Sequence, residues 1–100
     1  MVRMEELASL IREHGEVLRE QFQVTALTVF GSTARHENHE GSDVDMFVDM
    51  PPKIYLVIAL KQYLEEILGC SVDVVRRHRG LNPQLIKEIE RDGINIFRAA

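Results

Sequence analysis

The sequence predicts an α/β (α+β) fold, in which a small mixed β-sheet of three to four strands is flanked by helices. Two observations support this expectation. Stretches with apolar residues at helical spacing alternate with short stretches rich in β-branched and aromatic residues along the 100-residue chain. Hydrophobic residues make up 45% of it, which suffices for one core and not for two. We therefore expect a single domain over residues 1–100.

The first half of the chain predicts a helix, two strands and a short helix between them. Apolar residues recur at helical spacing over roughly residues 3–21. Residues 24–30 (VTALTVF) have the composition of a first strand. Ser32 is then expected to cap a short helix that begins at Thr33. After a polar stretch, residues 42–50 (SDVDMFVDM) predict the second strand.

The second half predicts two helices that alternate with strands. Residues 54–68 form a long apolar stretch, which Gly69 can end as a helix. Residues 71–75 (SVDVV) are interpreted as the third strand. Asn82-Pro83 is typical of a cap and first turn, and it starts a last helix. Residues 94–97 (INIF) after that helix are expected to form a short edge strand.

The connections predict how the strands pair. A long helix joins the second and third strands, and such a crossover favours a parallel pair. The short connection between the first and second strands favours an antiparallel or splayed arrangement. The end of the first strand and the starts of the other two then lie at one edge.

Three aspartates are expected at that edge. Asp43 and Asp45 share one face of a strand, about 7 Å apart, and repel each other by roughly 2–3 kcal/mol at an effective dielectric constant near 20. Asp73 stands between two valines of the third strand, where aspartate is disfavoured. Clustered carboxylate oxygens suit Mg²⁺, which binds through a few carboxylates and substrate phosphates.

The Gly31-Ser32 pair completes the pattern. Glycine lets the backbone approach a phosphate, the start of a helix offers free N–H groups, and the Ser32 hydroxyl adds a donor. The pair alone is common. Its spacing of ten residues from Asp43-Val44-Asp45, followed by a third strand aspartate, indicates a site for a nucleotide and a metal.

The stretch FGSTARHENHEGSDVDMFVDM resembles the G-S-x10-D-x-D signature of the DNA polymerase β-like nucleotidyltransferase superfamily. SVDVV is similar to the strand that carries the third carboxylate of that family. The length and the ending LNPQLIKEIERDGINIF resemble the minimal nucleotidyltransferases (MNT), which are often encoded beside a HEPN-domain protein. Many members have glycine where His36 follows Arg35 here, so the turn is expected to differ in shape.

The resemblance implies a Mg-dependent enzyme that transfers AMP from ATP to a partner protein, as the antitoxin of a HEPN ribonuclease toxin. It implies that Gly31 and Ser32 hold the triphosphate. It also implies that Asp43 and Asp45 bind two Mg²⁺ ions, and that Asp73, a further metal ligand, helps activate the acceptor hydroxyl. The mechanism would be a two-metal in-line displacement. The alternative is a non-catalytic antitoxin that inhibits its partner by occlusion.

The length leaves no room for an added acceptor-binding domain, so the acceptor is expected from another chain. A net charge of −4 disfavours stable nucleic-acid binding through a broad basic face. No apolar run is long enough to span a membrane. The single cysteine, Cys70, excludes an internal disulfide and favours the cytoplasm.

Arg35 and a short basic run each have two interpretations. Arg35, one turn after Ser32, either contacts the nucleotide or acts as a structural bracket. The basic run from Arg76 to Arg79 is either a solvated loop or a docking site for an acidic or nucleotide-bearing partner. Tyr55 and Tyr63 are expected to pack inside. Asp49 shares the strand face of Asp45, but it lies about 13 Å further on and is excluded from the metal site.

Overall fold

A computed structural model describes residues 2–99, and its four strands form one mixed sheet with the order β3-β2-β1-β4. In chain order the elements are α1 (Met4–Glu13), α2 (Gly15–Glu20), β1 (Ala26–Phe30), α3 (Gly31–Ala34), β2 (Val44–Asp49), α4 (Ile54–Leu68), β3 (Val72–Arg76), α5 (Pro83–Asp92) and β4 (Ile94–Arg98). Strand β1 is antiparallel to β2 and β4, whereas β2 and β3 are parallel. The predicted fold class and strand pairings are confirmed.

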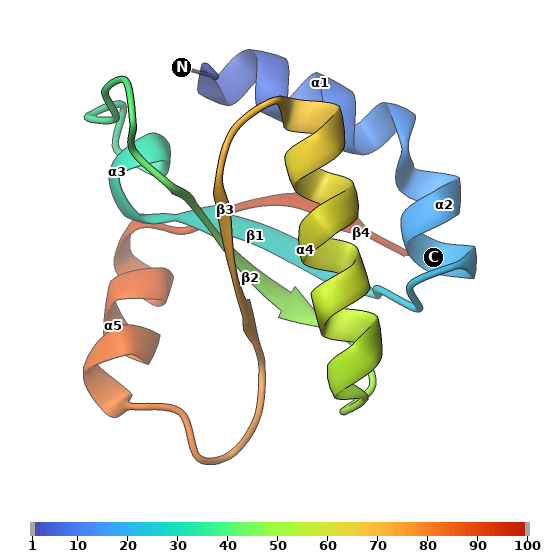
Figure 1. Ribbon diagram of the computed structural model, residues 1–100. Coiled ribbons are helices and arrows are strands. Elements are labelled where there is room, and N and C mark those ends of the chain that lie inside the picture. Colours follow the sequence, from blue (N-terminus) through green and yellow to red (C-terminus); the bar gives the residue numbers. More distant parts are fainter. Residues whose placement is uncertain (1, 100) are drawn as a thin grey trace.

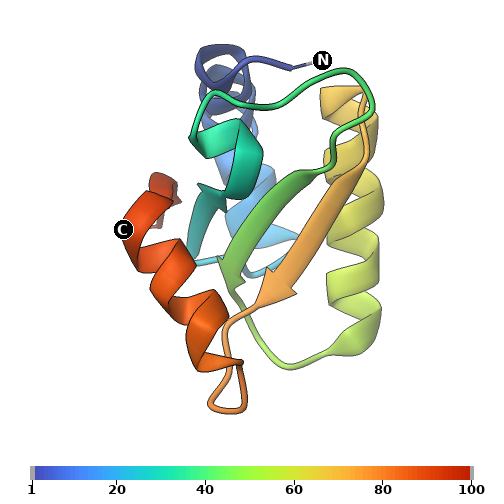
Figure 2. The same cartoon turned by 90° about the vertical axis from the view of Figure 1, so that its left-hand side faces the viewer.

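Helices cover both faces of the sheet (Figures 1 and 2). Residues of β2 alternate between the faces, as a pleated strand requires. Val44, Met46 and Val48 face the larger core beneath α1, α2 and α4. Phe47 packs with Ile89 of α5 in a smaller core on the opposite face. Because Asp45 has the parity of Phe47, its side chain lies on the α5 face.

The single helix expected over residues 3–21 is wrong, because the helix breaks into α1 and α2 at His14. The His14 backbone leaves helical geometry, with φ −99° and ψ 15°, and its ring Nδ1–H donates to the Leu10 carbonyl at 2.8 Å. Gly15 then lies against the Phe97 ring, since a Cβ at this position would come within 3.0 Å of Phe97 Cε1. Gly15 thus gives room to a ring on β4, a contact between remote residues that local periodicity does not report.

The remaining boundaries agree closely with expectation, with two differences near the site. The second strand begins at Val44, so Asp43 precedes it. The proposed Ser32 cap is also wrong, because α3 begins at Gly31 and makes no side-chain cap hydrogen bond. By contrast, the Asn82 side chain accepts from the Gln84 N–H at 2.8 Å and caps α5 as expected. None of the helices over residues 2–99 has the length and apolar character needed to cross a bilayer.

Candidate active site

The strand register brings two of the three predicted aspartates together. In the parallel β2–β3 pair, Asp45 lies directly opposite Asp73. Directly opposed residues of neighbouring strands point to the same sheet face, so both carboxylates lie on the α5 face. Asp43 stands two residues before Asp45, just outside β2. All three therefore lie at the edge where β2 and β3 begin.

Gly31, directly after β1, lies close to the Asp45 side chain. Phe30, the last residue of β1, lies opposite Asp45 in the antiparallel β1–β2 register. Gly31 follows with φ 73°, a backbone conformation that side chains disfavour. A Cβ built on Gly31 would overlap Oδ2 of Asp45. The glycine thus allows the first turn of α3, which includes Ser32, to approach the carboxylate.

Several negative charges lie around Asp45. Burial raises the pKa of Asp45 most, and the charges of Asp73, Asp43 and Glu88 raise it further, against a smaller lowering by Arg35. Within residues 2–99, none of the three predicted aspartates forms an ion pair with lysine, arginine or histidine. A cation bound at this edge would relieve the repulsion, so the oxygen donor set fits Mg²⁺.

The side chains do not enclose a metal ion by themselves. Among residues 2–99, no three acidic, histidine or cysteine side chains are grouped closely enough to do so. Mg²⁺ commonly uses only one or two protein carboxylates and completes its shell with water and substrate phosphates. The arrangement therefore suits an ion that arrives with a triphosphate better than a resident structural ion.

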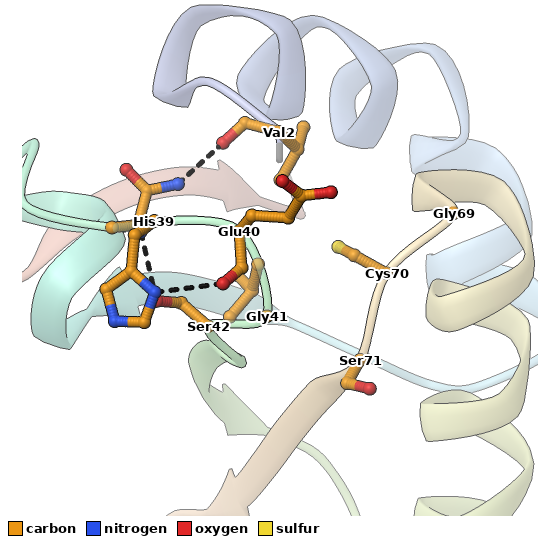
Figure 3. Close-up of a pocket in the computed structure, with 10 residues that line it drawn as sticks. Val2, His39, Glu40, Gly41, Ser42, Gly69, Cys70 and Ser71 are labelled. Atoms are coloured by element: carbon orange, nitrogen blue, oxygen red, sulfur yellow. Dashed lines mark hydrogen bonds between the residues drawn. The ribbon is translucent and has the colours of Figure 1, made fainter.

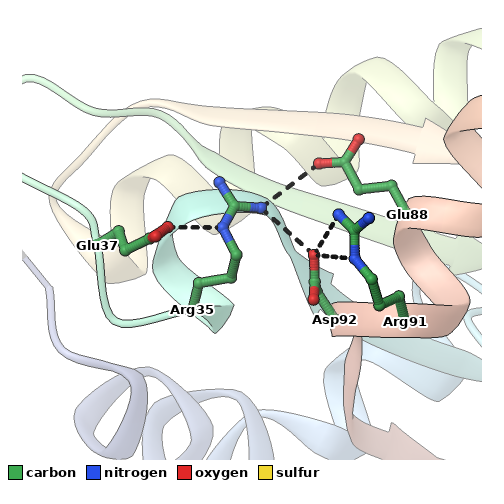
Figure 4. A network of polar contacts seen from close by, with 5 residues as sticks. All are labelled: Arg35, Glu37, Glu88, Arg91 and Asp92. Atoms are coloured by element: carbon green, nitrogen blue, oxygen red, sulfur yellow. Dashed lines mark hydrogen bonds and ion pairs between the residues drawn. The ribbon is translucent and has the colours of Figure 1, made fainter.

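Arg35 lies in a network of acidic side chains that joins α3 to α5 (Figure 4). Its Nε donates to Glu37 at 2.8 Å, and its Nη1 lies 3.6 Å from carboxylate oxygens of both Glu88 and Asp92. Asp92 also accepts from Arg91 at 2.9 Å. These contacts favour the interpretation of Arg35 as a bracket that holds the Gly31-Ser32 turn against α5.

Glu88 and Asp92 were not predicted from the sequence. They lie one helical turn apart on α5, beside the buried Ile89, and both reach Arg35. An acidic i, i+4 pair next to an apolar stripe was the available signal. Asp49, in contrast, pairs with Arg77, which agrees with its exclusion from the metal site.

A cavity of about 270 Å³ lies beside the same edge of the sheet (Figure 3). Its walls come from the loop over residues 38–42 and the turn over residues 69–71, with Val2 and Val44 between them. His39 is exposed in that loop, and its Nδ1–H donates to the Glu40 carbonyl at 2.9 Å. Cys70 is half-buried, and burial raises the pKa of its thiol. Asp43 does not line the cavity, although its chain neighbours Ser42 and Val44 do.

Comparisons with protein families and with known sequences find relatives that are all named as nucleotidyltransferases or adenylyltransferases. The model of the family "Polymerase beta, Nucleotidyltransferase" matches residues 13–100. The protein adenylyltransferase MntA of Thermococcus cleftensis is 38% identical over 94 residues, which cover 89% of this chain and 95% of that protein. A Methanocaldococcus jannaschii protein, provisionally named a protein adenylyltransferase, is 36% identical over 98 residues, or 96% of this chain and 100% of that protein.

Solved structures share the fold. One described as a minimal nucleotidyltransferase has a TM-score of 0.73 and 35% identity, and the match covers 93% of this chain and 95% of that chain. The complex of tri-AMPylated Shewanella oneidensis HEPN toxin with MNT antitoxin matches with a TM-score of 0.66 and 19% identity, covering 93% of this chain and 73% of that chain. At that lower identity the likeness shows the fold alone.

Proposed function

Because the chain belongs to the polymerase beta nucleotidyltransferase family, as one of its minimal members, we propose that it transfers AMP from ATP to a hydroxyl of a partner protein. The partner proposed is a HEPN-domain toxin in the cytoplasm, which this chain neutralises as an antitoxin. The names of its sequence relatives support protein adenylylation. A structural neighbour in which an MNT antitoxin is bound to an AMPylated HEPN toxin supports the choice of partner.

One observation carries the proposal. Asp45 lies between Asp73 on β3 and the Gly31 turn after β1, so the acidic groups lie next to the turn that we propose binds the triphosphate. A structural domain has no need to keep a half-buried aspartate beside two others of the same charge, because such burial costs stability. Function accounts for the arrangement where stability does not.

Each residue has a role in the proposed reaction. The backbone of Gly31 and the Ser32 hydroxyl bind the triphosphate, while Asp43 and Asp45 would hold two Mg²⁺ ions. When bound, Mg²⁺ neutralises charge on the triphosphate and makes the acceptor hydroxyl easier to deprotonate. Asp73, which lies on the edge strand β3 opposite Asp45, would be a further metal ligand and would help activate the acceptor hydroxyl by accepting its proton.

The proposed reaction is a single displacement at the α-phosphorus of ATP. The acceptor oxygen forms a bond to the α-phosphorus of ATP, and the bond from that phosphorus to the bridging oxygen of the β-phosphate breaks. Pyrophosphate leaves with the electron pair of the broken bond. The chain mainly positions the reacting groups, as is usual for transfer of phosphoryl-type groups. Arg35 contributes by holding α3 in place, and its direct contact with the nucleotide stays a prediction.

The test is the intact mass of the partner. The chain is mixed with a HEPN-domain protein, ATP and Mg²⁺, and the proteins are separated under denaturing conditions. We expect a partner heavier by one or more AMP groups, and an unchanged partner with the Asp43→Asn/Asp45→Asn variant. A partner that is unmodified but inhibited while bound, and that recovers on dissociation, would leave only inhibition by occlusion.

A further inference from the structure

Large apolar side chains are exposed at the start of α4. Ile54 is 73% exposed, Tyr55 66% and Ile58 50%. Ile58 lies four residues after Ile54 and three after Tyr55, so it neighbours both on the helix surface and joins them into one patch. We call this group the α4 patch. The expected packing of Tyr55 is therefore wrong, whereas Tyr63 packs against the Phe22 ring at 5.1 Å between centroids.

The α4 patch borders a groove of about 420 Å³ between the start of α4 and the end of β3. These two elements run side by side in both views (Figures 1 and 2). Val74 and Val75, both half-buried, line the groove from β3. Val74 packs toward the larger core and Val75 toward the smaller one, so the groove wraps around the edge of the sheet.

Strand β3 is an edge strand, and only its beginning is covered. The Ser71 carbonyl accepts from the Val44 N–H, so odd-numbered residues face β2 and even-numbered residues turn their backbone groups outward. The outward Val72 N–H donates to the Glu65 carboxylate at 3.0 Å. The backbone of Val74, beside the groove, faces no strand. A partner can therefore approach the outer side of β3 near Val74, towards the end of the strand. Near Val72, at the start of the strand, the Glu65 side chain covers the backbone.

Basic side chains surround the groove. Lys53, Arg76 and His78 line it, although the chain as a whole has a net charge of −4. An exposed apolar face with a basic border is complementary to apolar side chains set in an acidic surface. The groove also lies near the proposed active site, since Arg76 is three residues from Asp73, or about 10 Å along the strand.

We propose that the acceptor protein docks on the α4 patch and this groove, through apolar side chains bordered by acidic ones. The inference rests on the proposed function, because it assigns the surface to the acceptor. A standard interface buries about 800 Å² on each partner, which corresponds to a radius of about 16 Å. The footprint of a protein centred on the groove would therefore extend as far as Asp73, which is close enough for one of its hydroxyl groups to reach the site.

The experiment measures binding of a purified HEPN-domain protein from the same genome. Tyr55→Ala/Ile58→Ala shortens the α4 patch at exposed helical positions, so it leaves no cavity, and alanine keeps the helix. Ile94→Ala is the matched control, because Ile94 is 37% exposed but lies on β4 at the opposite edge. Lys53→Glu tests the charge complementarity. For each variant, the thermal shift produced by ATP with Mg²⁺ reports the nucleotide site.

We expect the patch variant to weaken binding about thirtyfold or more, as loss of a central aromatic anchor does, while the control changes it less than about threefold. Lys53→Glu should weaken binding most at low salt. All variants should keep the wild-type thermal shift. Wild-type affinity in the patch variant would overturn the inference, as would a dimer of the chain alone that the patch variant dissociates.

The two proposals fail in different ways. Transfer of AMP by both the wild type and the patch variant, at equal rates, would support the proposed function and overturn the docking surface. Loss of binding in the patch variant, with no AMP on the partner of the wild type, would support the docking surface and overturn transfer.

Discussion

Replacement of Asp45 by asparagine should stabilise the protein in the absence of metal. The side chain keeps its shape and loses the charge that burial, Asp73 and Asp43 all disfavour. Neighbouring strands lie about 4.8 Å apart, so the two paired carboxylates are roughly 5–6 Å apart. The repulsion between them is about 3 kcal/mol at an effective dielectric constant of 20 and about 0.8 kcal/mol in bulk water.

Solvent reaches the half-exposed Asp45, so we take about 1 kcal/mol as the expected gain in the free energy of unfolding. For a domain of about 100 residues this corresponds to a rise in Tm of about 4–8 °C. The folded state binds the Asp45 proton more tightly than the unfolded state, because its pKa is raised. Wild-type stability therefore falls as pH rises from about 3.9 through the folded pKa, and Asp45→Asn lacks this loss.

Thermal unfolding followed by circular dichroism, with chelator present, tests the prediction. The gain in Tm should be absent near pH 3 and complete at pH 7. Asp49→Asn is the matched control on the same strand face, and it should lower Tm slightly, because Asp49 pairs with Arg77. If Asp45→Asn were less stable than the wild type at pH 7, the carboxylate would have a structural role and the argument for a metal site would fail.

Four further predictions concern the same region. ATP with Mg²⁺ should stabilise the fold by about 2.7 kcal/mol at a hundred times its Kd, and an equal thermal shift with chelator would contradict the metal site. Gly31→Ala should lower the free energy of unfolding by about 1–3 kcal/mol, the cost of a strained positive φ, and so lower Tm. It should also abolish the thermal shift with ATP and Mg²⁺, because its Cβ overlaps Asp45, and a wild-type Tm and shift would be inconsistent with the geometry. Glu88→Gln should lower the pKa of Asp45 in an NMR titration of the metal-free protein, since Glu88 raises it; an unchanged value would separate α5 from the site. Cys70 should react with a maleimide more slowly than free cysteine at pH 8, because burial raises the pKa of its thiol, and an equal rate would mean an open cavity.

Spacing along the chain was enough to predict most of the fold. Alternation in residues 42–50 predicted that Asp43 and Asp45 share one face, and the helix over residues 54–68 favoured the parallel pairing of β2 with β3, which is confirmed. The αL geometry of Gly69 and the Asn82 cap follow from side-chain and backbone chemistry within a few residues. These features are local, so the sequence contains the information directly.

Contacts between remote segments were decided only by the tertiary structure. Alternation along β3 determines which face of the sheet Asp73 occupies. The register that sets Asp73 opposite Asp45 arises because both strands pack against the two cores. Glu88 meets Arg35 only because α5 folds back over the sheet. The sequence by itself therefore determined most of the elements and the types of residue expected at the site. Their pairing was decided by the tertiary structure, because side chains far apart in the chain become neighbours only when the core forms.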